Sequence, residues 1–294
     1  MEFIDTHTHN TDEAFRGEED EVIARALGAG VTHLIQPDID SSERDGMFAL
    51  CERYPGVLLP MLGLYPCSVV KGWEKEIEAL YPYRDRGIVA IGEIGLDYHD
   101  DDFDPEAQKA ALKVQFELAA EWDLPVNIHL RDASEDFLSV LKECSYLGLR
   151  GSLHAFGGSR EFFERVCRYG DFSVGIGGVV TFRNSRIGRD IADIPLNRIV
   201  LETDSPYLSP VPFRGRRNES SNIPVIAGFI ARQKGVSLEE VAAATTETQK
   251  DFSRYDRKIF DTDDLYRGDH RDETGPDETG PDPLRFQPDP PGGA

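Results

Sequence analysis

The sequence lacks paired cysteines and long apolar runs. Its four cysteines are scattered, with no C-x-x-C pair, which argues against a thiolate zinc cluster and against a secreted disulfide framework. No apolar run approaches the roughly 18 residues that a membrane helix needs, and no basic start precedes an apolar stretch. We therefore expect neither a membrane span nor a signal peptide. We expect a cytoplasmic protein with reduced thiols.

Positive charge is also scarce. The 294 residues include 32 lysines and arginines against 54 aspartates and glutamates, a formal net charge of -22 at pH 7. Such a surface repels polyanions, which argues against tight, sequence-independent nucleic-acid binding at low salt. Only eight of the basic residues are lysine. An acidic, lysine-poor chain fits a cytosol of high salt, where screening shortens the reach of surface charge and the net charge says little about the substrate.

What the sequence does contain is an alternation of apolar, β-branched runs with amphipathic segments. Eight strand candidates lie at residues 3–9, 31–37, 57–64, 88–95, 125–130, 151–156, 172–178 and 198–204. The clearest helix is expected from Pro105 to Trp122 behind Asp104 as N-cap, and another follows Ser159. Residues 222–252 supply closing helices, with a capping box at residues 237–240. Eight strands alternating with helices over about 250 residues predict a (β/α)8 barrel of TIM type.

The composition changes from about residue 257. The segment DETGPDETGPDP is a short tandem repeat, and QPDPPGGA follows it. Such a segment has too few apolar groups to offset the entropy of ordering it. We therefore predict a barrel domain at residues 1–256 and an acidic, Gly/Pro-rich disordered tail at residues 257–294. The tail is expected to be a solubilising or salt-adapting appendage, with partner binding as the alternative.

Histidines and carboxylates gather where the predicted strands end. His7 and His9 end the first strand, Glu93 the fourth, His129 the fifth, His154 the sixth and Asp204 the eighth. Side chains at the carboxyl ends of the strands carry the chemistry of such barrels. Each residue alone has a structural explanation, such as a strand end, a helix cap, a turn or a satisfied buried histidine. Together, four imidazoles and two carboxylates suit two divalent ions with one bridging group, and a mononuclear site is the alternative.

Ordered motifs extend this pattern along the chain. They are FIDTHTH, GEIGLDYH, HLRDA, HAFGGS, GGVVTFRN, ETDSPYLSP and RGRRNE. Through them, residues 3 to about 252 resemble the TatD family of metal-dependent hydrolases. The resemblance implies that one metal is surrounded by His7, His9, Glu93 and Asp204, and a second by Glu93, His129 and His154, with Glu93 as the bridge. It also implies hydrolysis of DNA phosphodiesters, typically by a magnesium- or manganese-dependent deoxyribonuclease that trims strands from an end.

The resemblance suggests catalytic roles for two of the ligands, and Tyr65 departs from the family pattern. As a hypothesis, Asp204 is both a metal ligand and the general base that accepts a proton from the attacking water. The resemblance gives Glu93 the role of bridging ligand. Tyr65 stands in GLYP where family members usually have a histidine in G-x-H-P. A phenol can donate a hydrogen bond to phosphate, but it does not carry charge as imidazolium does. The departure puts the substrate in doubt and leaves every proposed ligand in place.

Arginines near the motifs are candidates for phosphate contacts. Arg131 follows His129 by two positions, and Arg214 lies in the loop after the last strand. Their forked guanidinium groups suit phosphate oxygens. For Arg131 the alternative is a buried ion pair with a neighbouring carboxylate such as Asp132. Arg216 and Arg217 are expected to be solvated loop charges.

Three functions are compatible with the sequence. The first is a cytoplasmic deoxyribonuclease that uses two divalent ions (Mg, Mn or Zn) on DNA ends or single-stranded DNA, with no membrane and no obligate protein partner. The second is a small-molecule amidohydrolase or phosphoesterase, because barrel and metal site do not fix the substrate. Tyr65 and the acidic surface favour it. The third is a catalytically idle scaffold, against which the presence of all six ligands argues.

Overall fold

Eight parallel strands form a nearly closed barrel in the computed structural model, which describes residues 1–100 and 102–253. The strands are β1 (Phe3–Asp5), β2 (Val31–Gln36), β3 (Leu58–Leu62), β4 (Ala90–Asp97), β5 (Val126–Arg131), β6 (Arg150–Leu153), β7 (Asp171–Ile176) and β8 (Ile199–Leu201). Each strand pairs with the next in chain order. The Thr6 N–H donates to the Leu201 carbonyl at 2.9 Å, so β1 also meets β8. The predicted (β/α)8 barrel is confirmed.

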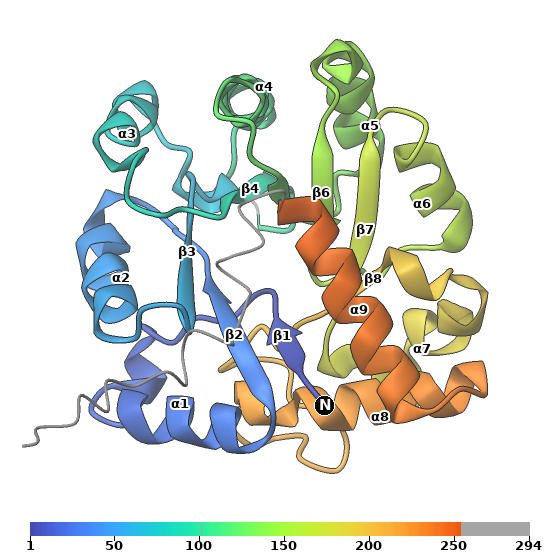
Figure 1. The fold of residues 1–294 in the computed structure, drawn as a ribbon. Helices are drawn as coiled ribbons and strands as arrows, with labels where there is room; N and C mark the ends of the chain where they lie inside the picture. Colours follow the sequence, from blue (N-terminus) through green and yellow to red (C-terminus); the bar gives the residue numbers. More distant parts are fainter. Residues whose placement is uncertain (101, 254–294) are drawn as a thin grey trace, which may run out of the picture. The chain divides into compact units, whose positions relative to one another are not determined.

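Helices alternate with the strands and surround them (Figure 1). They are α1 (Glu19–Gly28), α2 (Ser41–Arg53), α3 (Glu74–Glu78), α4 (Pro105–Glu121), α5 (Ser134–Glu143), α6 (Arg160–Val166), α7 (Arg186–Asp190), α8 (Ile223–Lys234) and α9 (Leu238–Ser253). In the part of the chain that the structure describes, none has the length and apolar character needed to cross a membrane. The predicted tail, residues 257–294, lies outside the described residues, as does the predicted domain boundary.

Side-chain caps set several helix starts, as the sequence predicts. Asp104 accepts hydrogen bonds from first-turn amides of α4, and Ser159 does the same for α6. Before α9, the Ser237 N–H donates to the Glu240 carboxylate at 2.8 Å, and the Glu240 N–H donates to the Ser237 hydroxyl at 3.1 Å. These bonds satisfy amides that have no partner within the helix.

Adjacent strand residues pack into two separate apolar clusters. Phe3, Leu34 and Leu58 belong to the larger cluster, which includes residues of the surrounding helices. Their neighbours Ile4 and Ile35 belong to a smaller cluster of strand and loop residues. Because successive side chains point to opposite faces of a strand, the small cluster fills part of the barrel interior and the large one joins strands to helices.

β1 and β8 end earlier than predicted, at Asp5 and Leu201, whereas β4 begins and ends two residues later than its prediction. It continues to Asp97, which pairs with Arg131 of β5, so Glu93 lies inside the strand and does not end it. The pairing shifts in register between Ile91 and Ile94. Such an irregularity re-aims the side chains beside it. The Glu93 side chain is 4% exposed and contacts His129 of the neighbouring β5 and His7, which follows β1.

A buried ion pair braces the same part of β4. Arg44 of α2 donates to the Asp38 carboxylate at 2.8 Å, and both side chains are almost fully buried. The Asp38 backbone in turn binds β4: its N–H donates to the Gly92 carbonyl at 3.3 Å, and its carbonyl accepts from the Glu93 N–H at 3.2 Å. The pair therefore holds the segment that positions Glu93.

Arg44→Ala should lower the free energy of unfolding by about 3–5 kcal/mol, because Asp38 would remain buried without its countercharge. Urea unfolding followed by circular dichroism measures the change. Arg53→Ala provides a control on the same helix, because Arg53 forms a solvent-exposed pair with Asp20. We expect that control to change stability by about 0–1 kcal/mol. Equal effects of the two substitutions would contradict the role given to Arg44.

Candidate metal centre

Six polar side chains converge at the carboxyl ends of the strands. His7 and His9 follow β1, Glu93 lies in β4, His129 in β5, His154 follows β6 and Asp204 follows β8. Three of them, His7, Glu93 and His154, are buried, and the other three are partly buried. The barrel therefore brings together residues that are up to 197 positions apart in the chain.

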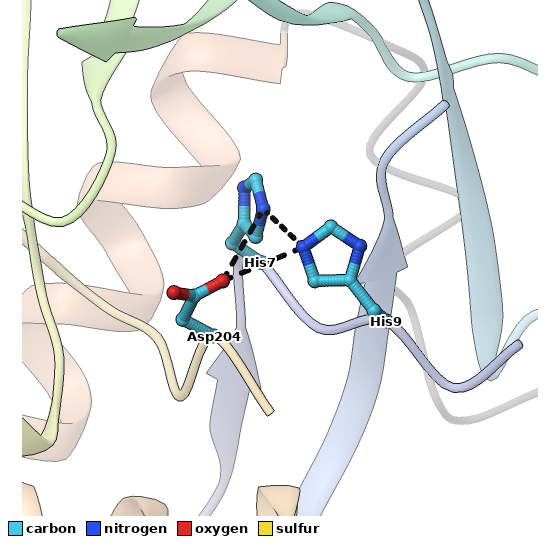
Figure 2. A group of neighbouring side chains, drawn as sticks. All are labelled: His7, His9 and Asp204. Atoms are coloured by element: carbon cyan, nitrogen blue, oxygen red, sulfur yellow. Dashed lines mark hydrogen bonds and ion pairs between the residues drawn. The ribbon is translucent and has the colours of Figure 1, made fainter. Parts of the chain in front are cut away.

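The meeting of β1 and β8 places Asp204 beside the first two histidines. The Asp204 N–H donates to the His7 carbonyl at 2.9 Å, and the His9 N–H donates to the Ser205 carbonyl at 2.9 Å. Asp204 has a φ of 54°, a left-handed conformation that aspartate tolerates better than most residues. Figure 2 shows the side chains of His7, His9 and Asp204 pointing toward one another.

The donor atoms are spaced as ligands of a single ion would be. His7 Nε2 lies 3.4 Å from Glu93 Oε2, and the Nε2 atoms of His9 and His154 lie 3.4 and 3.6 Å from Asp204 Oδ1. Two ligands at about 2.1 Å from a tetrahedral ion lie about 3.4 Å apart. Two groups of described residues have all ligand atoms within 4.8 Å: His7, His9 and Asp204, and His7, Glu93 and His154. This nitrogen and oxygen set fits a divalent cation.

His129 contacts the centre only through Glu93. Its Nδ1 lies 2.9 Å from Glu93 Oε1, and its Nε2 lies 2.8 Å from Asp97 Oδ2. Glu93 Oε1 also lies 3.9 Å from His154 Nε2, whereas Glu93 Oε2 faces His7. One carboxylate oxygen is thus directed to each side of the centre, which is the arrangement that a bridging carboxylate requires.

Polar groups outside the centre hold the histidine rings. The His7 Nδ1 lies 2.9 Å from the Asn127 Oδ1, and the His154 Nδ1 lies 3.2 Å from a carboxylate oxygen of the fully buried Glu202. The His129 ring is held by Asp97, whose Oδ2 lies 2.8 Å from the His129 Nε2. Contacts of this kind fix the orientation of a metal-binding imidazole and the ring nitrogen that carries its proton.

The electrostatics of the centre favour a cation. Burial would raise the pKa of Glu93, but the nearby imidazoles of His7, His129 and His154 hold it well below its usual range. Burial is likewise outweighed at Asp204, whose pKa is lowered chiefly by His154. Burial opposes protonation of His154, yet the neighbouring carboxylates, Glu202 foremost, raise its pKa to about 10. Burial lowers the pKa of His7, so its imidazole is neutral and free to bind a cation, whereas the ionised carboxylates around His154 keep a proton on that ring, which a bound cation would replace.

A cavity of about 1100 Å³ opens onto the centre. It is lined by Tyr65 and Arg131, together with His9, Glu93, His129, His154 and Asp204. The structure describes no ion pair between Arg131 and Asp132, because Asp132 contacts His99 at 2.8 Å instead. Burial, with Glu93 nearby, raises the pKa of Tyr65, so its phenol keeps its proton and can donate a hydrogen bond.

Arginines of the loop after β8 lie away from this cavity. Arg214 is not among the lining residues; its guanidinium lies over the Phe182 ring, 4.3 Å from the centroid. Arg217 pairs with Glu18 at 2.8 Å and Glu219 at 3.1 Å. The Arg217 side chain is 27% exposed, so it is a partly solvated loop charge that pairs with these two carboxylates and does not line the cavity.

Comparison with known proteins decides the family. A family model described as TatD related DNase matches residues 4–253. The chain belongs to the TatD family. The resemblance inferred from the seven motifs is therefore confirmed, and the match covers nearly all of the residues that the structure describes.

Several TatD-type proteins are similar over most of their length. A Bacillus subtilis protein named uncharacterized metal-dependent hydrolase YabD is 36% identical over 254 residues, which cover 84% of this chain and 97% of that protein. Human deoxyribonuclease TATDN3 is 33% identical over 258 residues, which cover 83% and 92%. The crystal structure of YjjV, a TatD homolog from Escherichia coli, matches with a TM-score of 0.78 at 32% identity, covering 85% and 97%. The chain is thus a metal-dependent hydrolase of the TatD family.

Sequence reasoning missed the three groups that hold the rings in this TatD barrel. A weak signal was present: Asn127 precedes His129 by two positions, and Glu202 precedes Asp204 by two, so in the predicted strands each pair would share a face. Asp97 follows Glu93 by four positions on β4. The spacing alone does not reveal that each group contacts an imidazole from a different part of the barrel.

Glu202→Gln should weaken binding of divalent metal about 10- to 100-fold, because a neutral amide holds the His154 ring less firmly and makes it a poorer donor. Titration calorimetry of the metal-free protein with Mn²⁺ measures the change. Glu239→Gln, an exposed position on α9, serves as the control. An unchanged dissociation constant in a folded Glu202→Gln protein would show that this carboxylate does not support the centre.

Proposed function

We propose that this TatD-family hydrolase cleaves phosphodiester bonds in DNA, using two divalent ions. The observation that carries the proposal is the convergence of four imidazoles and two carboxylates at one cavity, with Glu93 directing an oxygen to each side. The naming of human TATDN3 as a deoxyribonuclease supports DNA as the substrate. We assign His7, His9, Glu93 and Asp204 to one ion, and Glu93, His129 and His154 to the other.

When bound, divalent ions of this kind make water more acidic and neutralise charge that develops on a phosphate. In the proposed mechanism Asp204 accepts the proton of the attacking water. Its side chain is 17% exposed against 4% for Glu93, so it is the carboxylate that water reaches. Its lowered pKa keeps it ionised at neutral pH, as a proton acceptor must be.

Two further side chains of the cavity are assigned to the substrate. Arg131 is exposed and lines the cavity without an ion pair to its neighbour Asp132, so its guanidinium is available for phosphate oxygens. The protonated Tyr65 phenol donates a hydrogen bond to the same group. Arg214, whose guanidinium lies over Phe182 and does not line the cavity, is not part of this proposal, and its contact with phosphate stays a prediction.

Turnover of a substrate panel by the metal-loaded protein tests this function. The panel contains single-stranded, nicked and abasic DNA together with amide and lactone substrates, at low and at multimolar salt. We expect hydrolysis of phosphodiesters that disappears on chelation and returns with added metal. Turnover confined to amides or lactones would replace the nuclease by a small-molecule amidohydrolase, and no turnover with any substrate would favour a binding scaffold.

A further inference from the structure

The four histidines of the centre form a row that ends in a tyrosine at each end. Along the row His9, His7, His154, His129, consecutive ring centroids lie 4.9, 3.5 and 6.4 Å apart. Beyond His9 lies Tyr207, 6.2 Å away, and beyond His129 lies Tyr65, 5.1 Å away. Both tyrosines line the cavity over the centre.

A hydrogen bond at its hydroxyl fixes the orientation of the Tyr207 ring. Its hydroxyl donates to the Asp12 carboxylate at 2.7 Å. Tyr207 is nevertheless 53% exposed, and its neighbour Leu208 is 43% exposed. An aromatic ring that is tethered at its polar end and open to solvent presents a face on which a nucleobase can stack. The centre therefore has an aromatic ring on each side of it.

Beyond the Tyr207 and Tyr65 rings, the surfaces that line the cavities are acidic, and we call them the acidic walls. On the Tyr207 side, Asp12, Glu13 and Glu43 line the cavity, with Arg16 as the cation among them. Arg16 is already paired with Glu13 at 3.1 Å. A nucleic-acid strand that continued over this wall would bring its phosphates toward carboxylates.

A second cavity, of about 670 Å³, carries the same sign of charge on the other side. It begins at Asp97, whose carboxylate contacts His129. Among the described residues, its charged lining is Glu74, Asp97, Asp100, Asp102 and Asp104 against the single cation Lys71. A strand leaving the centre in this direction would also meet negative charge.

We propose that the preferred substrate is a short phosphodiester of dinucleotide size, with one base on Tyr207, the other toward Tyr65 and its single phosphate at the centre. This inference rests on the proposed phosphodiesterase function and names the substrate class of the same site. Cavities of roughly 300–1,000 Å³ enclose molecules of drug size, and a dinucleotide falls in that class. A longer strand adds phosphates that the acidic walls repel, and the cations described there are Arg16, already paired with Glu13, and Lys71, which the carboxylates outnumber.

Substrate length and salt together test the proposal. The full-length, Mn²⁺-loaded protein is assayed for kcat/KM with the dinucleotide dTpdT and with a 20-nucleotide single strand, at low and at high salt. The Debye length falls from about 10 Å at 0.1 M to about 3 Å at 1 M, so salt screens the walls. At 0.1 M salt we expect kcat/KM for dTpdT to be at least tenfold higher than kcat/KM for the long strand. At 1 M the value for the long strand should rise about fivefold or more, with dTpdT changing less than twofold.

The combined variant Glu43→Gln, Asp100→Asn and Asp102→Asn tests the walls directly. It removes three charges without touching a proposed ligand, the Tyr207 tether or the Asp104 helix cap. At 0.1 M salt, kcat/KM of this variant for the long strand should rise as much as it does for the unaltered protein at 1 M salt. Glu239→Gln with Glu161→Gln, at exposed positions outside both cavities, is the matched control and should leave the length preference unchanged.

The stacking role of Tyr207 has its own readout. Tyr207→Ala should raise KM for dTpdT about tenfold with kcat changed less, because a stacked base contributes to binding and not to bond cleavage. Tyr207→Phe retains the ring and should recover most of the loss. Tyr146→Ala, a tyrosine that is 74% exposed and outside both cavities, is the control.

Three different failures can be distinguished. A long strand that is cleaved faster than dTpdT at 0.1 M, with a rate that falls as salt rises, would overturn the short-substrate proposal and leave the phosphodiesterase function intact. A KM for dTpdT that Tyr207→Ala leaves unchanged would overturn the assignment of the base to Tyr207. Failure to cleave any phosphodiester, long or short, would overturn the proposed function itself.

Discussion

Asp204→Asn should lower kcat with a phosphodiester substrate by about 10²- to 10⁴-fold, because an amide cannot accept the proton of the attacking water. The substitution preserves shape, and the backbone bond from Asp204 to His7 does not involve the side chain. The protein should therefore remain folded. Metal content by elemental analysis and initial rates with DNA are measured on the same sample, so that loss of metal is separated from loss of the base.

The control for this experiment is Asp12→Asn. Asp12 lines the same cavity and binds Tyr207, but it lies outside the compact ligand groups. We expect it to change KM more than kcat, in contrast to Asp204→Asn. An Asp204→Asn protein that keeps full turnover with its metal bound would remove Asp204 from the role of general base.

Glu93→Gln should abolish stoichiometric binding of one of the two ions and reduce turnover at least a hundredfold, about the contribution of a positioned catalytic group. Glu93 is the side chain whose two oxygens face His7 on one side and His129 and His154 on the other. A neutral amide has a single oxygen acceptor and cannot bridge two cations. Calorimetric titration with Mn²⁺ gives the number of sites.

The Glu202→Gln protein provides the comparison for Glu93→Gln. Glu202 acts through the His154 ring, so its loss should weaken binding without changing the number of sites. If Glu93→Gln bound the same number of ions as the unaltered protein with similar affinity, Glu93 would not be the bridge, and the assignment of ligands to two ions would have to be revised.

The barrel could be predicted because its signal is local. Each strand is an apolar run of a few residues between amphipathic helices, and the caps at Asp104, Ser159 and Ser237 mark helix starts within three or four residues. The six candidate ligands could be found for a related reason. In a parallel barrel the chemistry gathers at the strand ends, so position along the strand predicts convergence in space.

Features that depend on pairing between strands could not be predicted. The placement of Glu93 inside β4 follows from a register shift against β5, which the sequence of β4 does not encode on its own. The same holds for the contact of Glu202 with His154, which joins β8 to β6. The ion pair of Arg217 could not be predicted, because its partner Glu18 is 199 positions away. Such contacts exist only once the barrel has closed.

The most direct test of the account is the anomalous diffraction of crystals of the full chain grown with Mn²⁺. We expect two peaks at the carboxyl end of the barrel, one on each side of Glu93, with His7, His9 and Asp204 around the first and His129 and His154 beside the second. Anomalous peaks found only elsewhere on the acidic surface, with none among these six side chains, would contradict the claim that the six side chains form the metal centre of this hydrolase.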